Sequence, residues 1–308
     1  MARLDWAAMS IAASPPFACP ICSSRRARWA AGHRGLRVAR CDECGHGYVW
    51  PVPAADFLEA IYRDPKYYQG AAESIGFHDY ESLGPARNRM FARHLTRIEA
   101  EVGTGRILDI GCATGDFLKV ARNRGWDVLG ADPSAARAQV EGAGIELVGT
   151  NVHDADVEKG SLDAVTFWDV LEHVTNPVAD LAQAHRLLKA GGVLALTVPD
   201  AANFIARVSG RRWFGYKTAG EHLQFFTHAS VRVALQTAGL VIRTLEPTTW
   251  SCTFGFLADR AGLYLGPPGR LLRAGVSRSG LANVLVDMPQ INQFALGVAI
   301  PVKQEAAR

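Results

Sequence analysis

The sequence predicts an α/β fold with a parallel sheet, preceded by a small cysteine-rich module. From about residue 87 onward, short apolar runs alternate with amphipathic helical patterns. The first of these runs leads through a glycine-rich turn directly into a helix, which is typical of a parallel sheet that binds a nucleotide. Four cysteines in two pairs near the N-terminus indicate the separate module.

Composition and charge exclude several classes of protein. The 308 residues are 48% hydrophobic and 20% charged, which excludes intrinsic disorder for most of the chain. The net charge of +3 is too mild for a dedicated nucleic-acid-binding protein. No window approaches the ~20 apolar residues of a membrane span, and Met1–Ala18 lacks the apolar segment of a signal peptide. We therefore expect a cytoplasmic protein with no transmembrane segment.

The two cysteine pairs have the spacing of a zinc ribbon. Cys19 and Cys22 form one C-x-x-C pair, Cys41 and Cys44 form the other, and eighteen residues separate the pairs. Two thiolates on a tight turn can bind one ion, so two such turns complete a tetrahedron. Disulfides and a redox pair are the alternatives, but neither a secretory signal nor a βαβ context supports them. We predict a structural zinc site.

The segment between the two pairs is strongly basic and contains no acidic residue. It is consistent with a surface that faces RNA or phosphate, or with the solvated face of a small ribbon. Its basic and aromatic residues are Arg25, Arg26, Arg28, Trp29, His33, Arg34, Arg37 and Arg40. RNA therefore stays a candidate partner, although the overall charge gives no strong nucleic-acid signal.

A glycine-rich turn joins the first predicted strand, Ile107–Ile110, to a helix over Phe117–Arg122. The turn reads Gly-Cys-Ala-Thr-Gly-Asp from Gly111 to Asp116. Glycines let a ligand approach the backbone, and the N-terminus of the following helix faces that ligand. The pattern D-x-G-x-x-x-G differs from the dinucleotide pattern G-x-G-x-x-G. Asp109 would repel a pyrophosphate but suits a cationic ammonium group, which disfavours a dehydrogenase.

An acidic residue ends the next predicted strand, Trp126–Ala131. Asp132 follows it, twenty-one residues after Gly111. A carboxylate at that place accepts hydrogen bonds from the two hydroxyls of an adenosine ribose. Asp132 also fits the N-cap of a helix that begins at Pro133, and the two roles are compatible.

The segment Leu108–Leu118 (LDIGCATGDFL) resembles the first motif of class I S-adenosylmethionine-dependent methyltransferases. Further matches follow in the family's order, including Phe167–Val174 (FWDVLEHV) at the end of the fourth strand and a fifth strand, Val193–Val198. The resemblance spans roughly residues 87–245. The nearest subgroup is the ubiquinone-type small-molecule methyltransferases, whose later signature is similar to Glu221–Thr227 (EHLQFFT).

The resemblance implies a Rossmann-like, seven-stranded methyltransferase sheet, S-adenosylmethionine as cofactor and a small molecule as methyl acceptor. The expected regions are a zinc ribbon at 1–52, a connector with cofactor-side aromatics at 53–86, and the methyltransferase domain at 87–308. The sixth and seventh strands are expected at Leu240–Leu245 and Phe294–Ile300, almost fifty residues apart. We predict a helical insertion at about 250–290 that forms a lid, a homodimer contact or a surface that meets lipid.

The resemblance also implies the residues that bind the cofactor. The expected set is Asp109, Gly111, Ala113 and Gly115 in the loop, Asp132 at the ribose, Asn151 and Val152 at the adenine, Trp168 near the sulfonium, and Tyr68 at the carboxylate. An aromatic face favours a cation, but Trp168 also fits a plain core tryptophan.

Three residues are the catalytic candidates: Glu172, His173 and His222. Asp169, Glu172 and His173 fall on one face of a helical turn. The resemblance implies that such a cluster binds a divalent ion, although Asp169 is one methylene shorter than the family's Glu. The alternative is that Glu172 and His173 tie the loop before Pro177. His222 is either a general base, since its ordinary pKa of ~6.5 suits that role, or a structural histidine.

The aromatic and basic segment at 203–217 is expected either to cover the substrate or to pack on the ribbon. Two alternatives remain for the function. One is an RNA methyltransferase that binds its substrate with the basic ribbon, and the other is a catalytically inactive scaffold that binds the cofactor. Salt-dependent RNA binding would favour the first. Cofactor binding without turnover would favour the second.

Overall fold

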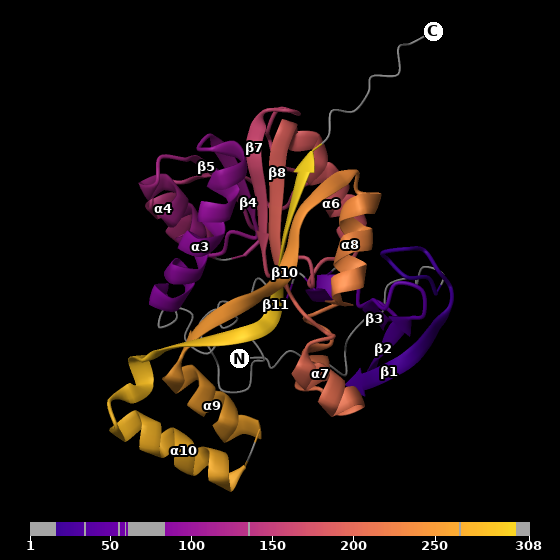
Figure 1. The fold of residues 1–308 in the computed structure, drawn as a ribbon, viewed down its shortest axis with the longest axis vertical. Coiled ribbons are helices and arrows are strands. Elements are labelled where there is room, and N and C mark those ends of the chain that lie inside the picture. The colour runs from indigo at the N-terminus through magenta and orange to yellow at the C-terminus, as the bar shows by residue number, and fades with distance from the viewer. Residues whose placement is uncertain are drawn as a thin grey trace.

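The computed structural model describes residues 17–33, 35–54, 56–58, 60, 84–134, 136–264 and 266–299. Figure 1 shows a central sheet with helices on both sides, a small sheet beside it and a pair of helices at one end. Tyr67 and Tyr68, the aromatics expected near the cofactor, lie outside the described residues.

The central sheet has seven strands, as predicted. They are β4 (Arg106–Ile110), β5 (Asp127–Ala131), β6 (Glu146–Gly149), β7 (Leu162–Trp168), β8 (Leu188–Pro199), β10 (Leu240–Thr253) and β11 (Leu285–Ala299). Their order is β10-β11-β8-β7-β4-β5-β6. The strands from β8 to β6 are parallel, and β11 is antiparallel to both β8 and β10. The runs in β4 and β7 are nearly continuous and apolar because both faces of a parallel sheet are covered.

Helices cover both faces of this sheet (Figure 1). On one side α3 (Gly84–Val102), α4 (Asp116–Asn123) and α5 (Arg137–Gly142) share one apolar core with the strands. On the other side lie α6 (Pro177–Leu187) and α8 (His228–Thr237), in a second core. Side-chain caps set where these last two begin, since Asn176 accepts a hydrogen bond from Ala179 N and Thr227 forms a capping box with Ser230. No helix in the described part of the chain is long and apolar enough to cross a bilayer.

The cysteine-rich module is a four-stranded antiparallel sheet whose last strand comes from the methyltransferase-like region. Its strands are β1 (Ala27–His33), β2 (Leu36–Cys41), β3 (Gly47–Trp50) and β9 (Gln224–Phe225), in that order. Gly47 pairs with Phe225 and Tyr48 with Gln224. Cys44 and Tyr48 also belong to the same apolar core as Phe226. The module is therefore joined to the central domain by a shared sheet and a shared core.

The segment after β8 packs on the module, which is one of the two arrangements expected for it. It forms α7 (Phe204–Ser209) and two short 3-10 helices, η2 (Gly210–Arg212) and η3 (Phe214–Thr218). Ala206 and Trp213 lie in a third core together with Leu36, Val38 and Val49 of the module. This packing attaches α7 to the outer face of the ribbon sheet.

The predicted helical insertion is present, but its flanking strands are longer than the sequence pattern indicates. The insertion consists of α9 (Phe254–Tyr264), α10 (Pro267–Arg278) and η4 (Leu281–Asn283). β10 and β11 stay paired as far as Thr253 and Leu285. The residues from Glu246 onward carry no apolar alternation, and their pairing with β11 keeps this part extended. We call the paired strands beyond the sheet, with their helices, the arm.

Candidate active site and metal centre

The glycine loop between β4 and α4 has an unusual backbone that a neighbouring loop requires. Gly111, Ala113 and Gly115 all have positive φ angles, of 70°, 48° and 73°. A Cβ atom on Gly111 would lie 2.5 Å from Cγ2 of Val170, which belongs to the loop after β7. Because only glycine fits there, the loops that follow the neighbouring strands β4 and β7 pack directly together.

Asp132, at the end of β5, is hydrogen-bonded to this loop. Its Oδ2 accepts a hydrogen bond from Ala113 N at 2.8 Å, and its Oδ1 accepts one from Ser134 N at 2.8 Å. The second bond closes a turn and does not cap a helix: α5 begins at Arg137 with Ala136 at its N-cap, so the N-cap role expected for Asp132 was wrong. The carboxylate therefore lies at the loop where a ribose is expected, and two amide groups orient it.

Asp109 lies one strand position before the loop and is almost fully buried. It accepts a hydrogen bond from Thr166 Oγ1 at 2.7 Å. Burial raises its pKa well above the ordinary value. A cationic group placed next to it would lower that pKa again, so the site favours a positively charged ligand.

The remaining expected cofactor residues have different surroundings. Asn151 is exposed in the loop after β6, whereas Val152 is buried in the core. Trp168 packs among aromatic rings, with His94 stacked at 5.1 Å and Phe117 edge-on at 5.1 Å between ring centroids. These contacts are those of a core tryptophan at the carboxyl end of β7.

Glu172, His173 and His222 come together beside the glycine loop. Ligand atoms from these three side chains lie within 4.8 Å of one another. The rings of His173 and His222 meet edge to face at 4.7 Å. His173 Nδ1 lies 3.0 Å from the carbonyl oxygen of Glu221. Because a carbonyl only accepts, Nδ1 carries the hydrogen and Nε2 keeps the lone pair.

Burial sets the charge of this cluster. It lowers the pKa of His173 to about 4 and that of His222 well below its ordinary value, so both imidazoles are neutral at pH 7. It raises the pKa of Glu172 well above its usual range, and the charge of Asp169 raises it further. Glu172 Oε2 is buried with no hydrogen-bond partner among the described residues. The cluster therefore offers two bases and one carboxyl group that still lacks a partner.

Asp169, expected as a metal ligand with Glu172 and His173, does not belong to the group that the structure assembles within 4.8 Å among the described residues. His222 takes its place. Asp169 Oδ1 instead accepts hydrogen bonds from Thr197 Oγ1 at 2.9 Å and Asn292 Nδ2 at 3.1 Å. Two imidazoles and one carboxylate suit a divalent transition metal such as zinc better than Mg²⁺, which prefers oxygen ligands.

Backbone and side-chain hydrogen bonds bring His222 to this place. The amides of Leu223 and Gln224 both donate to the carbonyl oxygen of Glu172, at 2.7 and 2.9 Å. Gln224 Nε2 donates to Val174 O at 2.8 Å, and Gln224 Oε1 lies 2.9 Å from Nε2 of the buried His46. Sequence reasoning missed the roles of Gln224 and His46. The available signals were the EHLQFFT signature itself and the position of His46, two residues after Cys44.

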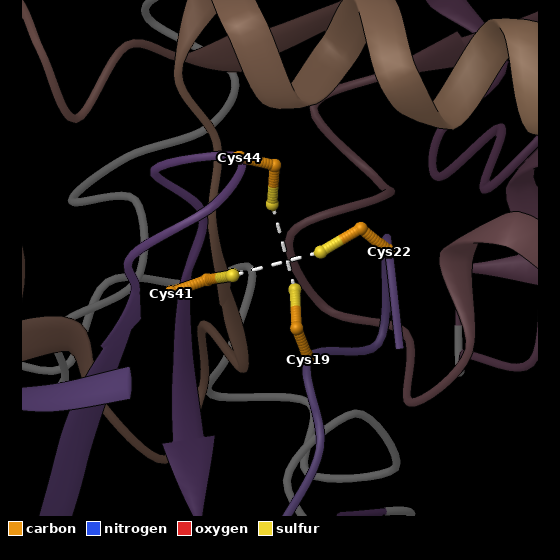
Figure 2. A group of neighbouring side chains, drawn as sticks. All are labelled: Cys19, Cys22, Cys41 and Cys44. Atoms are coloured by element: carbon orange, nitrogen blue, oxygen red, sulfur yellow. Dashed lines mark hydrogen bonds between the residues drawn. The ribbon is translucent and has the colours of Figure 1, made fainter. Parts of the chain in front are cut away.

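The four N-terminal cysteines converge on one point (Figure 2). The Sγ atoms of Cys19 and Cys44 are 3.6 Å apart, and those of Cys22 and Cys41 are 3.5 Å apart. A tetrahedral zinc ion with Zn–S bonds of ~2.3 Å requires S···S separations of ~3.8 Å, so the geometry fits zinc. A hydrogen bond between Cys19 and Cys44 raises the pKa of the former and lowers that of the latter.

Comparisons with known proteins agree with this architecture. Residues 78–245 match the family model described as a methyltransferase domain. A ubiquinone biosynthesis O-methyltransferase of Cereibacter sphaeroides is 30% identical over 172 residues, which are 50% of this chain and 68% of the relative. One from Xanthomonas axonopodis is 30% identical over 184 residues, 54% and 72% of the two chains.

The fold is shared with a solved structure as well. A protein of Bacillus halodurans, described as a methyltransferase, superimposes with a TM-score of 0.50 at 19% sequence identity, covering 68% of this chain and 98% of that one. The fold is thus that of the Rossmann-like methyltransferases. The chain belongs to the methyltransferase domain family, and it is an S-adenosylmethionine-dependent methyltransferase.

Proposed function

We propose that this protein transfers the methyl group of S-adenosylmethionine to a hydroxyl group of a small molecule. The observation that carries the proposal is the convergence of Glu172 and His173, from the loop that packs against the glycine loop at Val170, with His222 from the segment before β9. The two relatives are named ubiquinone biosynthesis O-methyltransferases, and these names support the choice of an oxygen as the acceptor atom.

The residues at the carboxyl edge of the sheet suit the parts of the cofactor. In this proposal, the backbone of Gly111, Ala113 and Gly115 lies against it, and Asp132 accepts hydrogen bonds from its ribose hydroxyls. Asp109 compensates the charge of its ammonium group. Asn151 and Val152 lie at the adenine, and Trp168 supports the wall behind the sulfonium. Tyr68 keeps its expected role at the carboxylate.

The reaction is an in-line displacement in which the acceptor oxygen bonds to the methyl carbon while the carbon–sulfur bond breaks. The sulfonium leaves as a neutral thioether, and the acceptor's proton passes to a neutral imidazole. His222 is the proposed base. His173, whose Nδ1 donates to the carbonyl oxygen of Glu221, lies next to it. The protein otherwise aligns the two substrates and excludes water. The same three side chains, Glu172, His173 and His222, could instead hold a divalent ion, which would lower the pKa of the acceptor hydroxyl. The lone pair of His222 would then bind the ion, so His222 would no longer be the group that activates the hydroxyl.

In the same proposal, Cys19, Cys22, Cys41 and Cys44 hold a structural zinc ion. Four thiolate ligands leave no open position on the metal, so the ion supports the fold and takes no part in the chemistry. The S···S distances of 3.5 and 3.6 Å support this assignment.

The experiment is incubation of the purified protein with methyl-labelled S-adenosylmethionine and a metabolite extract. We expect label in a small molecule. His222→Asn should lower kcat by about 10²–10⁴-fold and leave cofactor affinity unchanged, since general-base catalysis contributes that much. The control is His228→Asn, an exposed histidine on α8. Label found only in added RNA would favour the RNA methyltransferase, and cofactor binding without any product would favour a scaffold.

A further inference from the structure

Exposed apolar side chains gather on two segments of the molecule. Nine large hydrophobic side chains are exposed in the described part of the chain, and eight of them lie on α7 or on the tip of the arm. The α7 patch is Phe204, Ile205 and Val208, and the arm patch is Leu271, Leu272, Leu281, Val284 and Leu285. Phe204, Val208 and Leu271 are more than 70% exposed. The ninth, Val241, lies elsewhere, on β10.

Both patches are held in place by packing on their inner sides. In α7, Ala206 is buried against the ribbon, so the opposite side of the helix faces outward. In the arm, α10 lies close against α9, because a Cβ atom on Gly269 would lie 1.9 Å from Ala261 O. Arg273 and Asp259 form an ion pair of 2.7 Å between the two helices. The exposed side chains therefore project from ordered helices.

Basic residues predominate around both patches. Residues 201–220 and 266–286 contain seven of the 33 Lys and Arg residues and none of the 30 Asp and Glu residues. The basic residues are Arg207, Arg211, Arg212 and Lys217 around the α7 patch, and Arg270, Arg273 and Arg278 around the arm patch. Asp259 on α9 neutralises one of them, Arg273, within the arm. The rest of the chain is net negative, so the positive charge is concentrated in these two segments and in the ribbon segment between the cysteine pairs.

The topology places both patches at the same end of the molecule as the active site. β11 is antiparallel to β8 and to β10, so β8 and β10 run in the same direction. Their last residues, Pro199 and Thr253, lead into α7 and α9 respectively. Figure 1 shows α7 and the α9–α10 pair below the carboxyl ends of the strands. The glycine loop and the His173 loop follow other strands at that same edge.

We propose that this end of the molecule docks on the surface of an anionic lipid bilayer. Apolar side chains surrounded by arginines are what a helix needs to lie in the headgroup region, where apolar burial and attraction to anionic lipids add together. A second copy of the chain would bring the like-charged rims together, which opposes self-association through these patches. If the proposed function holds, an acceptor dissolved in the lipid would reach the active site directly from the bilayer.

The test is cosedimentation of the full chain with vesicles of phosphatidylcholine, with or without about 30% phosphatidylglycerol. We expect binding to the anionic vesicles that weakens as salt is raised, and little binding to the neutral ones. Leu271→Ser/Leu272→Ser and Phe204→Ser/Val208→Ser should each weaken binding about tenfold or more. Val241→Ser removes the one large exposed hydrophobic side chain outside the patches among the described residues, and it should leave binding unchanged.

Two variants that remove positive charge measure the electrostatic contribution to vesicle binding. Arg270→Gln/Arg278→Gln should weaken binding to anionic vesicles, whereas Arg232→Gln, an exposed arginine on α8, should not. The absence of anionic vesicle binding would overturn the proposal. So would a dimer in sedimentation velocity that Leu271→Ser/Leu272→Ser dissociates, since the arm patch would then be a contact between copies. Cofactor titration and methyl labelling without vesicles report on the proposed function independently.

Discussion

The carboxylate of Asp132 joins two segments of the proposed cofactor site through two hydrogen bonds. It accepts from the amide of Ala113 in the glycine loop and from the amide of Ser134 in the turn after β5, and it lies where the ribose hydroxyls are expected. Asp132→Ala should weaken S-adenosylmethionine binding by about 1–3 kcal/mol, because the ribose hydroxyls lose their acceptor. Isothermal titration measures this. Asp127→Ala, an exposed acid at the other end of β5, is the control, and equal affinity of both variants would place the cofactor elsewhere.

His94 is a buried residue whose imidazole lacks polar partners. Neither ring nitrogen has a hydrogen-bond partner among the described residues, and the ring is stacked between Trp168 and Phe294. Burial lowers its pKa to about 3. His94→Phe should therefore stabilise the fold by about 1–3 kcal/mol at pH 7, since an apolar ring of similar shape has no unsatisfied group.

The gain from His94→Phe should depend on pH. The depressed pKa means that the unfolded chain binds a proton below pH ~6.5 while the folded chain does not, so the wild-type histidine costs stability as the pH falls. The difference between variant and wild type should thus be about 1 kcal/mol larger at pH 5.5 than at pH 7. Urea unfolding of both proteins at the two pH values measures it. A pH-independent difference would show that the pKa of His94 is not lowered in the folded protein.

Single residues differ in how far the sequence could predict them. Gly111 and Asp132 follow from local spacing, because strand, turn and helix succeed one another along the chain. The pairing of His222 with His173 depends on a tertiary contact between segments 49 residues apart, and no local pattern encodes it. Trp168 could not be assigned, because an aromatic residue at a strand end suits a core and a ligand equally.

At the scale of elements, the two-residue strand β9 connects the ribbon to the proposed catalytic cluster. Val49 N donates to Leu223 O at 2.9 Å, and the amides of Leu223 and Gln224 donate to the carbonyl oxygen of Glu172. Removing zinc with a chelator should release this segment, so turnover should fall about tenfold or more while cofactor affinity stays within about threefold. Hydrogen exchange at the amides of Leu223 and Gln224 should rise in parallel.

Two variants make the zinc prediction specific. Cys41→Ser/Cys44→Ser should lose the metal, which we expect at about one zinc per chain by elemental analysis. Gln224→Ala should keep the metal and still lose turnover, because it removes the hydrogen bonds to Val174 and His46. Gln236→Ala, exposed on α8, is the control. Full turnover in the chelated protein would show that the ribbon does not position the cluster.

The arm shows why some elements were not predictable. The apolar run from Phe294 onward is readable as a strand because it is buried in the central sheet, and Leu240–Leu245 is readable from its short run of apolar residues. The continuation to Thr253 begins with Glu246 and Pro247, which disfavour a strand by composition. It is extended because it pairs with β11. Burial of one face of a strand leaves a periodic pattern in the sequence, whereas pairing with another strand leaves none.

For the whole molecule, the arm's helices stand apart from the folded core. None of the three apolar cores in the described part of the chain includes a residue from 254–284. Replacing these residues by Asn-Gly, a two-residue hairpin turn between the paired Thr253 and Leu285, should keep the free energy of unfolding within about 1 kcal/mol. Denaturant unfolding and cofactor titration check this. A large loss of stability would mean that the helices support the sheet.

The ribbon sheet also bears on how the chain folds during synthesis. All four cysteines emerge within the first 44 residues, so the metal can be captured early, but β9 at Gln224–Phe225 must emerge before the fourth strand can be added. Contacts of such high sequence separation form slowly, because a long loop must close first. His46 is buried in the folded protein and lies within hydrogen-bonding distance of Gln224. It therefore stays exposed to solvent until the segment that contains Gln224 has been synthesised and has docked. We therefore expect the two cysteine turns to form early and to dock on the central domain late, so that Glu172, His173 and His222 come together only in that late step.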